Sequence, residues 1–244
     1  MKKKNLFIIS FCLLALFSLS ITYYYKRVKY GKKEGYISQI IQTGFEKEAL
    51  KTSDLAQILG LSIDRPLSIA SLNKKKLEET LLSIPFIKEA KVKQKESNAL
   101  IIDYSVRKPV FWVADGGNLG MDKEAYLFPI SPFFTPKNMP KLYLGLSGLE
   151  KIWNRRIDHP RIDKAFKIFS LFNGDPIRVK QIDVSNPLEL VVILNQAGGL
   201  HYLRLTSNNY EKERRYYHAL LSQLSLEKDC VIDLRVPNLA FIKK

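Results

Sequence analysis

Residues 100–109, LIIDYSVRKP, decide the fold because their side chains alternate in character along the chain. The apolar side of this stretch holds Leu100, Ile102, Tyr104 and Val106. The polar side holds Asp103, Ser105 and Arg107. A period of two residues is typical of a β-strand with one buried face. Pro109 cannot donate a backbone hydrogen bond to a sheet, so it marks the end of the strand and the boundary of a folded unit.

Two short helices are predicted upstream of this strand. The first begins at the N-cap residues Thr52–Asp54 and ends at Gly60, which favours the conformation that stops a helix. The second begins at Asn73 and ends before Pro85, and its inward side carries Leu77, Leu81 and Leu82.

Two further strands complete this unit. One is expected at Tyr36–Thr43, and the other is the stretch in which Ala90 and Val92 alternate with lysines. Residues 36–109 therefore read β-α-α-β-β, and we expect Leu81 and Ile102 to lie in its core.

Residues 110–244 predict a mixed β-sheet domain with helices. Its first strand is expected at Val110–Ala114, and a second strand ends at Phe128. Further strands are expected at 179–184, 188–195, 200–205, 230–234 and 240–242. One helix follows Pro160, and another follows a capping box formed by Asn208 and Glu211. Few residues follow the last strand, so we expect it at or near a sheet edge.

The N-terminal stretch, residues 5–25, contains no charged side chain. A helix of this length reaches about 30 Å, the thickness of the hydrocarbon core of a bilayer. The stretch predicts a transmembrane signal anchor between a cytoplasmic N-terminus (1–4) and a basic linker (26–35) that touches anionic lipid. The residues expected to hold the chain in the lipid bilayer are Leu6, Phe7, Leu13, Leu14 and Phe17.

Two alternatives to this anchor stay open. Ser18 and Ser20 have the small-x-small spacing of a signal peptide that is cut between Ser20 and Ile21. The lysines and the arginine of the linker outnumber the three leading lysines, which favours the opposite orientation of the span.

The formal net charge of +15 predicts affinity for something anionic, or simply a solvated basic surface. No catalytic or metal-binding constellation stands out, because His159, His201 and His218 are far apart and the paired-cysteine spacing of a zinc site is missing. With Cys12 in the apolar run, Cys230 has no disulfide partner in the rest of the chain. We predict no cofactor, no metal and no nucleic-acid partner.

The order of these elements resembles the bacterial cell-division family FtsQ/DivIB, whose first extracytoplasmic unit is a POTRA domain. The motifs that carry the resemblance are the two helical segments at 52–61 and 71–92, the junction VRKPV at 106–110, the hairpin MDKEAYLF at 121–128, the segment at 139–148, and VIDLRVPN at 231–238. The sequence departs from the family's usual pattern at Ala125, where glycine is usual, at Val236, where an aromatic residue is frequent, and at Leu239, where glycine is frequent.

The resemblance implies an α+β protein with an N-terminal transmembrane helix, a POTRA-like domain over 36–109 and a β domain over 110–244. It also implies a non-enzymatic, single-span scaffold of the division complex. Such a scaffold lies in the bacterial inner membrane with most of the chain outside the cytoplasm, at the division site, and links FtsL- and FtsB-like partners to septal wall synthesis. The alternatives are an enzyme or binding protein for an anionic envelope polymer and a POTRA-type envelope-assembly factor.

The partner-binding residues are expected at the edge formed by the last strand. An edge strand presents unpaired backbone groups that an incoming segment can pair with. The residues expected there are Val236, Pro237, Asn238, Leu239 and Phe241. For Phe241 the alternative is that its ring packs inward as the last residue of the core.

Overall fold

A computed structural model describes residues 16–25, 35–43, 50–62, 67–95, 98–131, 139–152, 154–224, 226 and 228–243. The predicted cytoplasmic N-terminus and nearly all of the basic linker lie outside these residues, as do the predicted anchor residues Leu6, Phe7, Leu13 and Leu14. The chain divides into two compact units, residues 1–81 with 90–103 and residues 82–89 with 104–244. The domain boundaries expected from the sequence stay a prediction.

One part of the predicted fold class, the transmembrane helix at the N-terminus, is contradicted by the structure. Residues 16–25 are helical, and Phe17 is 66% exposed. Within the described ranges no helix is long and apolar enough to cross a membrane. The fold class was therefore wrong to include a transmembrane helix at 5–25, whereas its mixture of sheets and helices is present.

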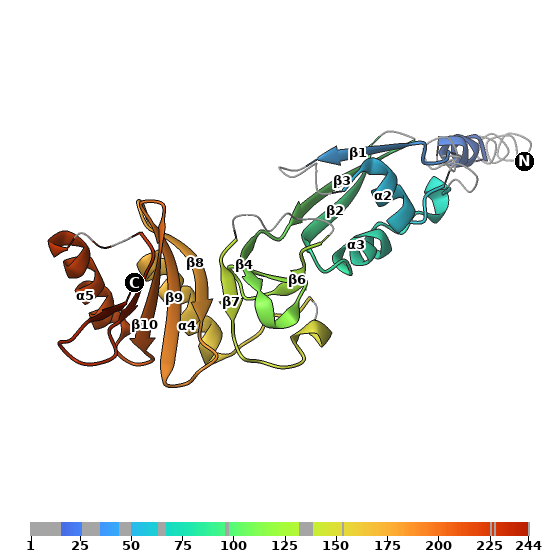
Figure 1. Ribbon diagram of the computed structural model, residues 1–244. Coiled ribbons are helices and arrows are strands. Elements are labelled where there is room, and N and C mark those ends of the chain that lie inside the picture. The colour runs from blue at the N-terminus through green and yellow to red at the C-terminus, as the bar shows by residue number, and fades with distance from the viewer. Residues whose placement is uncertain are drawn as a thin grey trace, which may run out of the picture. The chain divides into compact units, whose positions relative to one another are not determined.

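The first unit is built on a three-stranded sheet, shown with its helices in Figure 1. Its elements follow the predicted order: β1 (Gln39–Thr43), α2 (Thr52–Ile58), η1 (Ile69–Ser71), α3 (Lys74–Leu82), β2 (Ile87–Lys95) and β3 (Ala99–Val106). The strand order is β1-β3-β2, and β1 runs parallel to β3. The central place of β3 explains why residues 100–106 carry the clearest pattern in the sequence.

The interior of this unit is apolar, as the periodicity predicts. Leu81 of α3 and Ile102 of β3 are both fully buried, which confirms the two core residues expected from the sequence. Leu55 of α2 and Val92 of β2 join them. Asn73 accepts a hydrogen bond from the backbone N–H of Lys76 and so caps α3 as expected.

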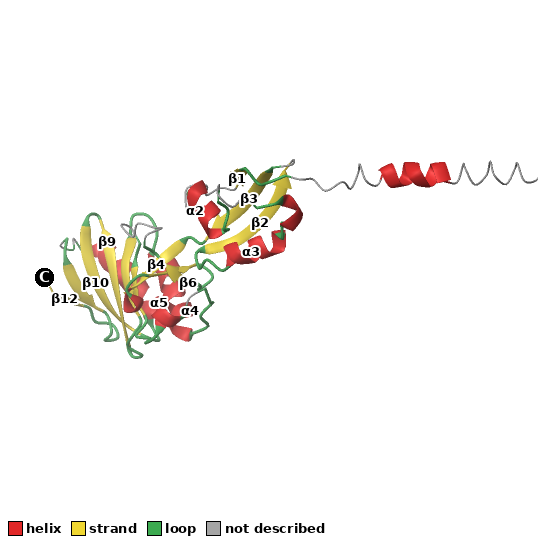
Figure 2. Cartoon of the chain, turned by 90° about the vertical axis from the view of Figure 1, so that its right-hand side faces the viewer, coloured by secondary structure: helices red, strands yellow, loops and turns green. Residues whose placement is uncertain are grey.

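The second unit is built on a nine-stranded sheet, whose strands and helices are distinguished by colour in Figure 2. Its elements are β4 (Pro109–Val113), η2 (Ala114–Gly116), β5 (Leu119–Asp122), β6 (Leu127–Pro129), β7 (Lys141–Tyr143), η3 (Leu149–Lys151), α4 (Pro160–Phe172), β8 (Arg178–Asp183), β9 (Glu189–Gln196), β10 (Gly199–Thr206), α5 (Tyr210–Gln223), β11 (Cys230–Asp233) and β12 (Phe241–Lys243). The strand order is β12-β11-β10-β9-β8-β7-β4-β5-β6.

Helices α4 and α5 cover one face of this sheet. The ring of Phe111 in β4 packs against Phe166 and Phe169 of α4, with 5.1 Å between the ring centroids in each pair. At the other end, the Tyr217 hydroxyl of α5 lies 2.8 Å from Nδ1 of the buried His201 in β10. The opposite face of the sheet therefore carries the residues that alternate with this core.

The start of α5 differs from the predicted capping box. The N-cap is Asn209, and no side chain caps it. Glu211 instead pairs with Lys167 of α4, at 2.5 Å. The carboxylate that fixes the helix is Glu213, which is buried and accepts hydrogen bonds from the backbone N–H and the hydroxyl of Thr206. This carboxylate ties the first turn of α5 to the end of β10.

The hairpin at Ala125 keeps a glycine-like turn without glycine. Ala125 has a φ of 63°, in the left-handed region that glycine adopts most easily. Asp122 stabilises the turn, because its carboxylate accepts hydrogen bonds from the backbone N–H groups of Glu124 and Tyr126. Asp122 also pairs with the buried Arg107 at 2.8 Å.

Candidate partner-binding edge

The last strand, β12, forms one edge of the nine-stranded sheet. It pairs antiparallel with β11, placing Phe241 opposite Asp233 and Lys243 opposite Val231. No described strand pairs with its other side. This confirms the expected position of the last strand, and it leaves backbone donors and acceptors on that side available to an incoming strand.

A tight turn leads the chain into β12. The backbone N–H of Leu239 donates to the carbonyl of Val236 at 3.1 Å, and Asn238 has a φ of 62°. Proline at the second position and asparagine at the third are the residues that a type II turn favours. The Tyr216 hydroxyl of α5 donates to the Asn238 side chain at 3.2 Å. Residues 236–239 are thus a turn held against α5, and it precedes the last strand, which was expected at 240–242 and is observed at Phe241–Lys243.

The side chains of this edge are apolar and exposed. Leu239 is 56% exposed, Phe241 58% and Ile242 42%. Single large apolar side chains are common on protein surfaces, whereas several in one patch indicate an interaction site. The ring of Phe241 does not pack inward as a core residue, so the inward alternative for this residue is wrong.

A pocket of about 300 Å³ opens beside the edge, between α5 and the turn. Its helical wall is formed by Tyr216, Ala219, Leu220 and Gln223. Leu234 and the segment 238–240 close the other side. An apolar side chain entering from a strand paired with β12 would find a mainly apolar cavity next to its backbone.

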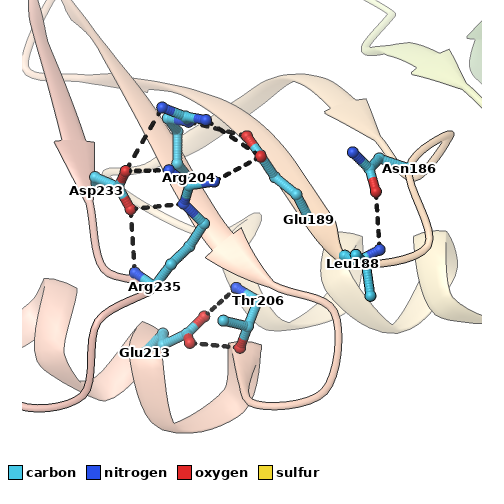
Figure 3. A network of polar contacts seen from close by, with 8 residues as sticks. All are labelled: Asn186, Leu188, Glu189, Arg204, Thr206, Glu213, Asp233 and Arg235. Atoms are coloured by element: carbon cyan, nitrogen blue, oxygen red, sulfur yellow. Dashed lines mark hydrogen bonds and ion pairs between the residues drawn. The ribbon is translucent and has the colours of Figure 1, made fainter.

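A network of ion pairs supports the edge from the neighbouring strands, as Figure 3 shows. Arg204 of β10 contacts Glu189 of β9 at 2.9 Å. Arg235 contacts Asp233 at 2.6 Å and Glu189 at 2.7 Å. Arg235 is the residue directly before the turn, so the network fixes the point at which the chain leaves β11.

The network lowers the pKa of both carboxyl groups. Hydrogen bonding from Arg204 is the main cause for Glu189, and hydrogen bonding from Arg235 is the main cause for Asp233, while partial burial opposes both shifts. Both carboxylates therefore stay ionised in the folded protein to a lower pH than they would in an unfolded chain.

The residues expected at this site lie together in the structure. Val236, Pro237, Asn238 and Leu239 form the turn, and Phe241 begins β12. Their role in partner binding stays a prediction. The pocket and the ion pairs were not predicted from the sequence, because they need residues of α5 and β9 that lie far from the C-terminus in the sequence. In the sequence, the basic and aromatic run KERRYY at 212–217 points to α5 as a candidate binding surface, and its Tyr216 lines the pocket.

Comparison with known families identifies the first unit. Residues 37–103 match the family model described as POTRA domain, FtsQ-type. The chain therefore contains an FtsQ-type POTRA domain, a class that is typically a non-enzymatic scaffold and takes part in protein–protein interaction. The match supports the recognition of the FtsQ/DivIB family made from the sequence. No curated protein matches the chain.

Proposed function

We propose that this protein is a non-enzymatic scaffold of the bacterial division complex. On this proposal it acts outside the cytoplasm at the division site, where it binds FtsL- and FtsB-like proteins and connects them to septal wall synthesis. The FtsQ-type POTRA domain supports a role in division or envelope assembly. The observation that carries the partner-binding step is the exposed apolar edge at β12.

The partner binds by adding a strand to β12. In this mode the backbone hydrogen bonds supply affinity, and alternate side chains of the added strand supply specificity. The pocket beside α5 accepts one such side chain, and Leu239 and Phe241 make apolar contacts with others. A short edge strand of three residues gives few backbone bonds, so the pocket contributes a large share of the affinity.

Truncation tests this proposal most directly. A chain that ends at Pro237 lacks β12 and should lose binding to the extracytoplasmic segment of an FtsB-like protein, measured by calorimetry. Amide hydrogen exchange at Leu81 and Ile102 checks that the first unit is still folded. If the folded, truncated chain binds with unchanged affinity, β12 is not the interface and attention moves to the POTRA domain.

A proline substitution makes the test finer. Ala240→Pro removes one backbone donor at the start of β12 and should weaken binding if that N–H faces the partner. Ala240→Ser keeps the donor at the same exposed position and is the matched control.

A further inference from the structure

The uncovered face of the nine-stranded sheet carries a continuous row of side chains that crosses seven strands. Residues directly opposite each other on neighbouring strands point to the same face. The pairing places these residues side by side in the order Trp112, Lys141, Gln181, Ile193, Tyr202, Val231 and Lys243. Six strand spacings of about 4.8 Å give this row a length of about 29 Å.

The next row along the strands shows that this face is the open one. Its members from β4 to β11 are fully buried, namely Val113, Leu142, Ile182, Val192, Leu203 and Ile232. Ile242 of β12 continues the row at the exposed edge. The buried members lie on the face that α4 and α5 cover. By contrast, Lys141 and Tyr202 in the first row are exposed and Trp112 is half-buried.

The row carries positive charges and no negative charge. Lys141 and Lys243 belong to it, no carboxylate does, and Lys180 lies beside it. The row beyond the buried one is different, since Asp183 and Asp233 accompany Arg204 there. Anionic groups are thus attracted to the first row, whereas Asp183, Asp233 and Glu189 lie farther along the strands, where arginines pair with Asp233 and Glu189.

The chemistry of the row is that of a surface for sugars. The indole N–H of Trp112 donates to the carbonyl of Gly117 at 2.6 Å, which fixes the ring, and Lys141 lies 5.4 Å from the ring centroid. The C–H groups of a sugar ring pack well on the negative face of an aromatic ring. Gln181 and the Tyr202 hydroxyl supply hydrogen-bonding groups further along.

A depression of about 570 Å³ lies over the middle of the row and is lined by Trp112, Lys141, Lys180, Gln181 and Tyr202, among others. Met139, Ile193 and Leu200 supply the aliphatic part of its lining, between the aromatic rings and the lysines. An amphipathic protein helix needs a broad apolar groove. A chain of hydroxylated rings needs aromatic faces, amides and ammonium groups instead, and the row provides these.

We propose that this row binds a linear anionic polysaccharide, whose carboxylate or phosphate groups pair with Lys141 and Lys180 and whose sugar rings lie on Trp112 and Tyr202. This activity goes beyond the scaffold role and uses a surface on the face of the sheet instead of the edge of β12.

The test measures binding of the full chain to end-labelled oligogalacturonate at low salt, with poly(glycerol phosphate) as a second arm. The double variant Lys141→Glu/Lys180→Glu should weaken binding at least tenfold. The matched control Lys91→Glu/Lys93→Glu makes the same change of charge on β2 and should alter binding less than twofold. An equal loss in both variants would show that only net charge matters and would overturn the proposal.

Two further comparisons identify the ligand. Tyr202→Ala should weaken oligogalacturonate binding several-fold without altering binding of the FtsB-like segment, which keeps this result separate from the test of β12. Neutral dextran should bind at least tenfold more weakly than oligogalacturonate. If poly-glutamate binds as tightly as oligogalacturonate and loses the same affinity in the Lys141/Lys180 variant, the row serves an acidic polypeptide and the polysaccharide is excluded. If only poly(glycerol phosphate) binds, which has no sugar rings, the anion is phosphate and the proposed contacts of sugar rings with Trp112 and Tyr202 are overturned.

Discussion

Two of the outer strands, β2 and β12, differ in how their unpaired edges are protected. Strand β2 is the outer strand of the three-stranded sheet, and three of its exposed residues are lysines, Lys91, Lys93 and Lys95. One of its backbone donors is also occupied, since the N–H of Val92 donates to the Glu78 side chain of α3 at 2.8 Å. Lysines and covering side chains are common protections of an edge strand.

Strand β12 has little of this protection. Two of its three residues, Phe241 and Ile242, are apolar and exposed, and a pocket opens next to them. An exposed apolar edge is a liability unless a partner covers it. The difference supports the proposal that β12 accepts an added strand, whereas β2 is protected against one.

The largest difference in stability is expected when a leucine near each of the two strands is replaced by alanine. Leu81→Ala removes a fully buried side chain next to the first sheet and should lower the free energy of unfolding by about 2–5 kcal/mol. Leu239→Ala removes an exposed side chain beside β12 and should change it by less than about 0.5 kcal/mol. Chemical denaturation measures both. Similar values for the two variants would mean that Leu239 is structural and would remove the contrast.

The features of the fold that depend on local sequence patterns could be predicted from the sequence. The alternation at 100–106 gave the central strand, and the N-cap Asn73 gave α3. The capping box at Asn208 failed because the carboxylate of Glu213 is paired with Thr206, a residue of the preceding strand. Long-range pairings of this kind leave no fixed spacing in a sequence.

The candidate site shows the same limit. Exposed residues of the C-terminal segment could be named from their position, because few residues follow the last strand. The pocket needs α5 to lie beside the turn, and the open row needs the register of seven strands. Neither follows from hydrophobic periodicity, which tells which face of an element is buried but not which residues of distant elements meet.

The second effect concerns pH at the network that supports β12. The pKa values of Glu189 and Asp233 are lowered in the folded protein, so their contribution to stability is present above the pKa of the unfolded chain. It is lost as the pH falls below the pKa values of the unfolded chain and through the lower values of the folded protein. Glu189→Gln should cost about 0.5–1 kcal/mol at neutral pH.

Denaturation at pH 7 and at pH 3 checks this prediction. The difference between the wild-type protein and Glu189→Gln should shrink at the lower pH, because the carboxylate of the unfolded chain is largely protonated there and must release that proton to form the ion pairs of the folded protein. A difference that stays the same at both values would show that the ion pairs do not stabilise this end of the sheet.

The smallest effect on stability, and the most informative one, is expected at Phe241. Its ring is 58% exposed, so Phe241→Ala should change the free energy of unfolding by less than about 0.5 kcal/mol. Val92→Ala on β2 is the matched control, because Val92 is buried and its shortening should destabilise the protein measurably. Binding of the FtsB-like segment should respond in the reverse order, with a clear loss in Phe241→Ala and none in a folded Val92→Ala. An apolar residue that costs nothing to remove from the free protein, yet weakens the complex, contributes through the partner alone. If Phe241→Ala instead destabilises the free protein and leaves binding unchanged, β12 is a structural edge and its difference from β2 has no function in recognition.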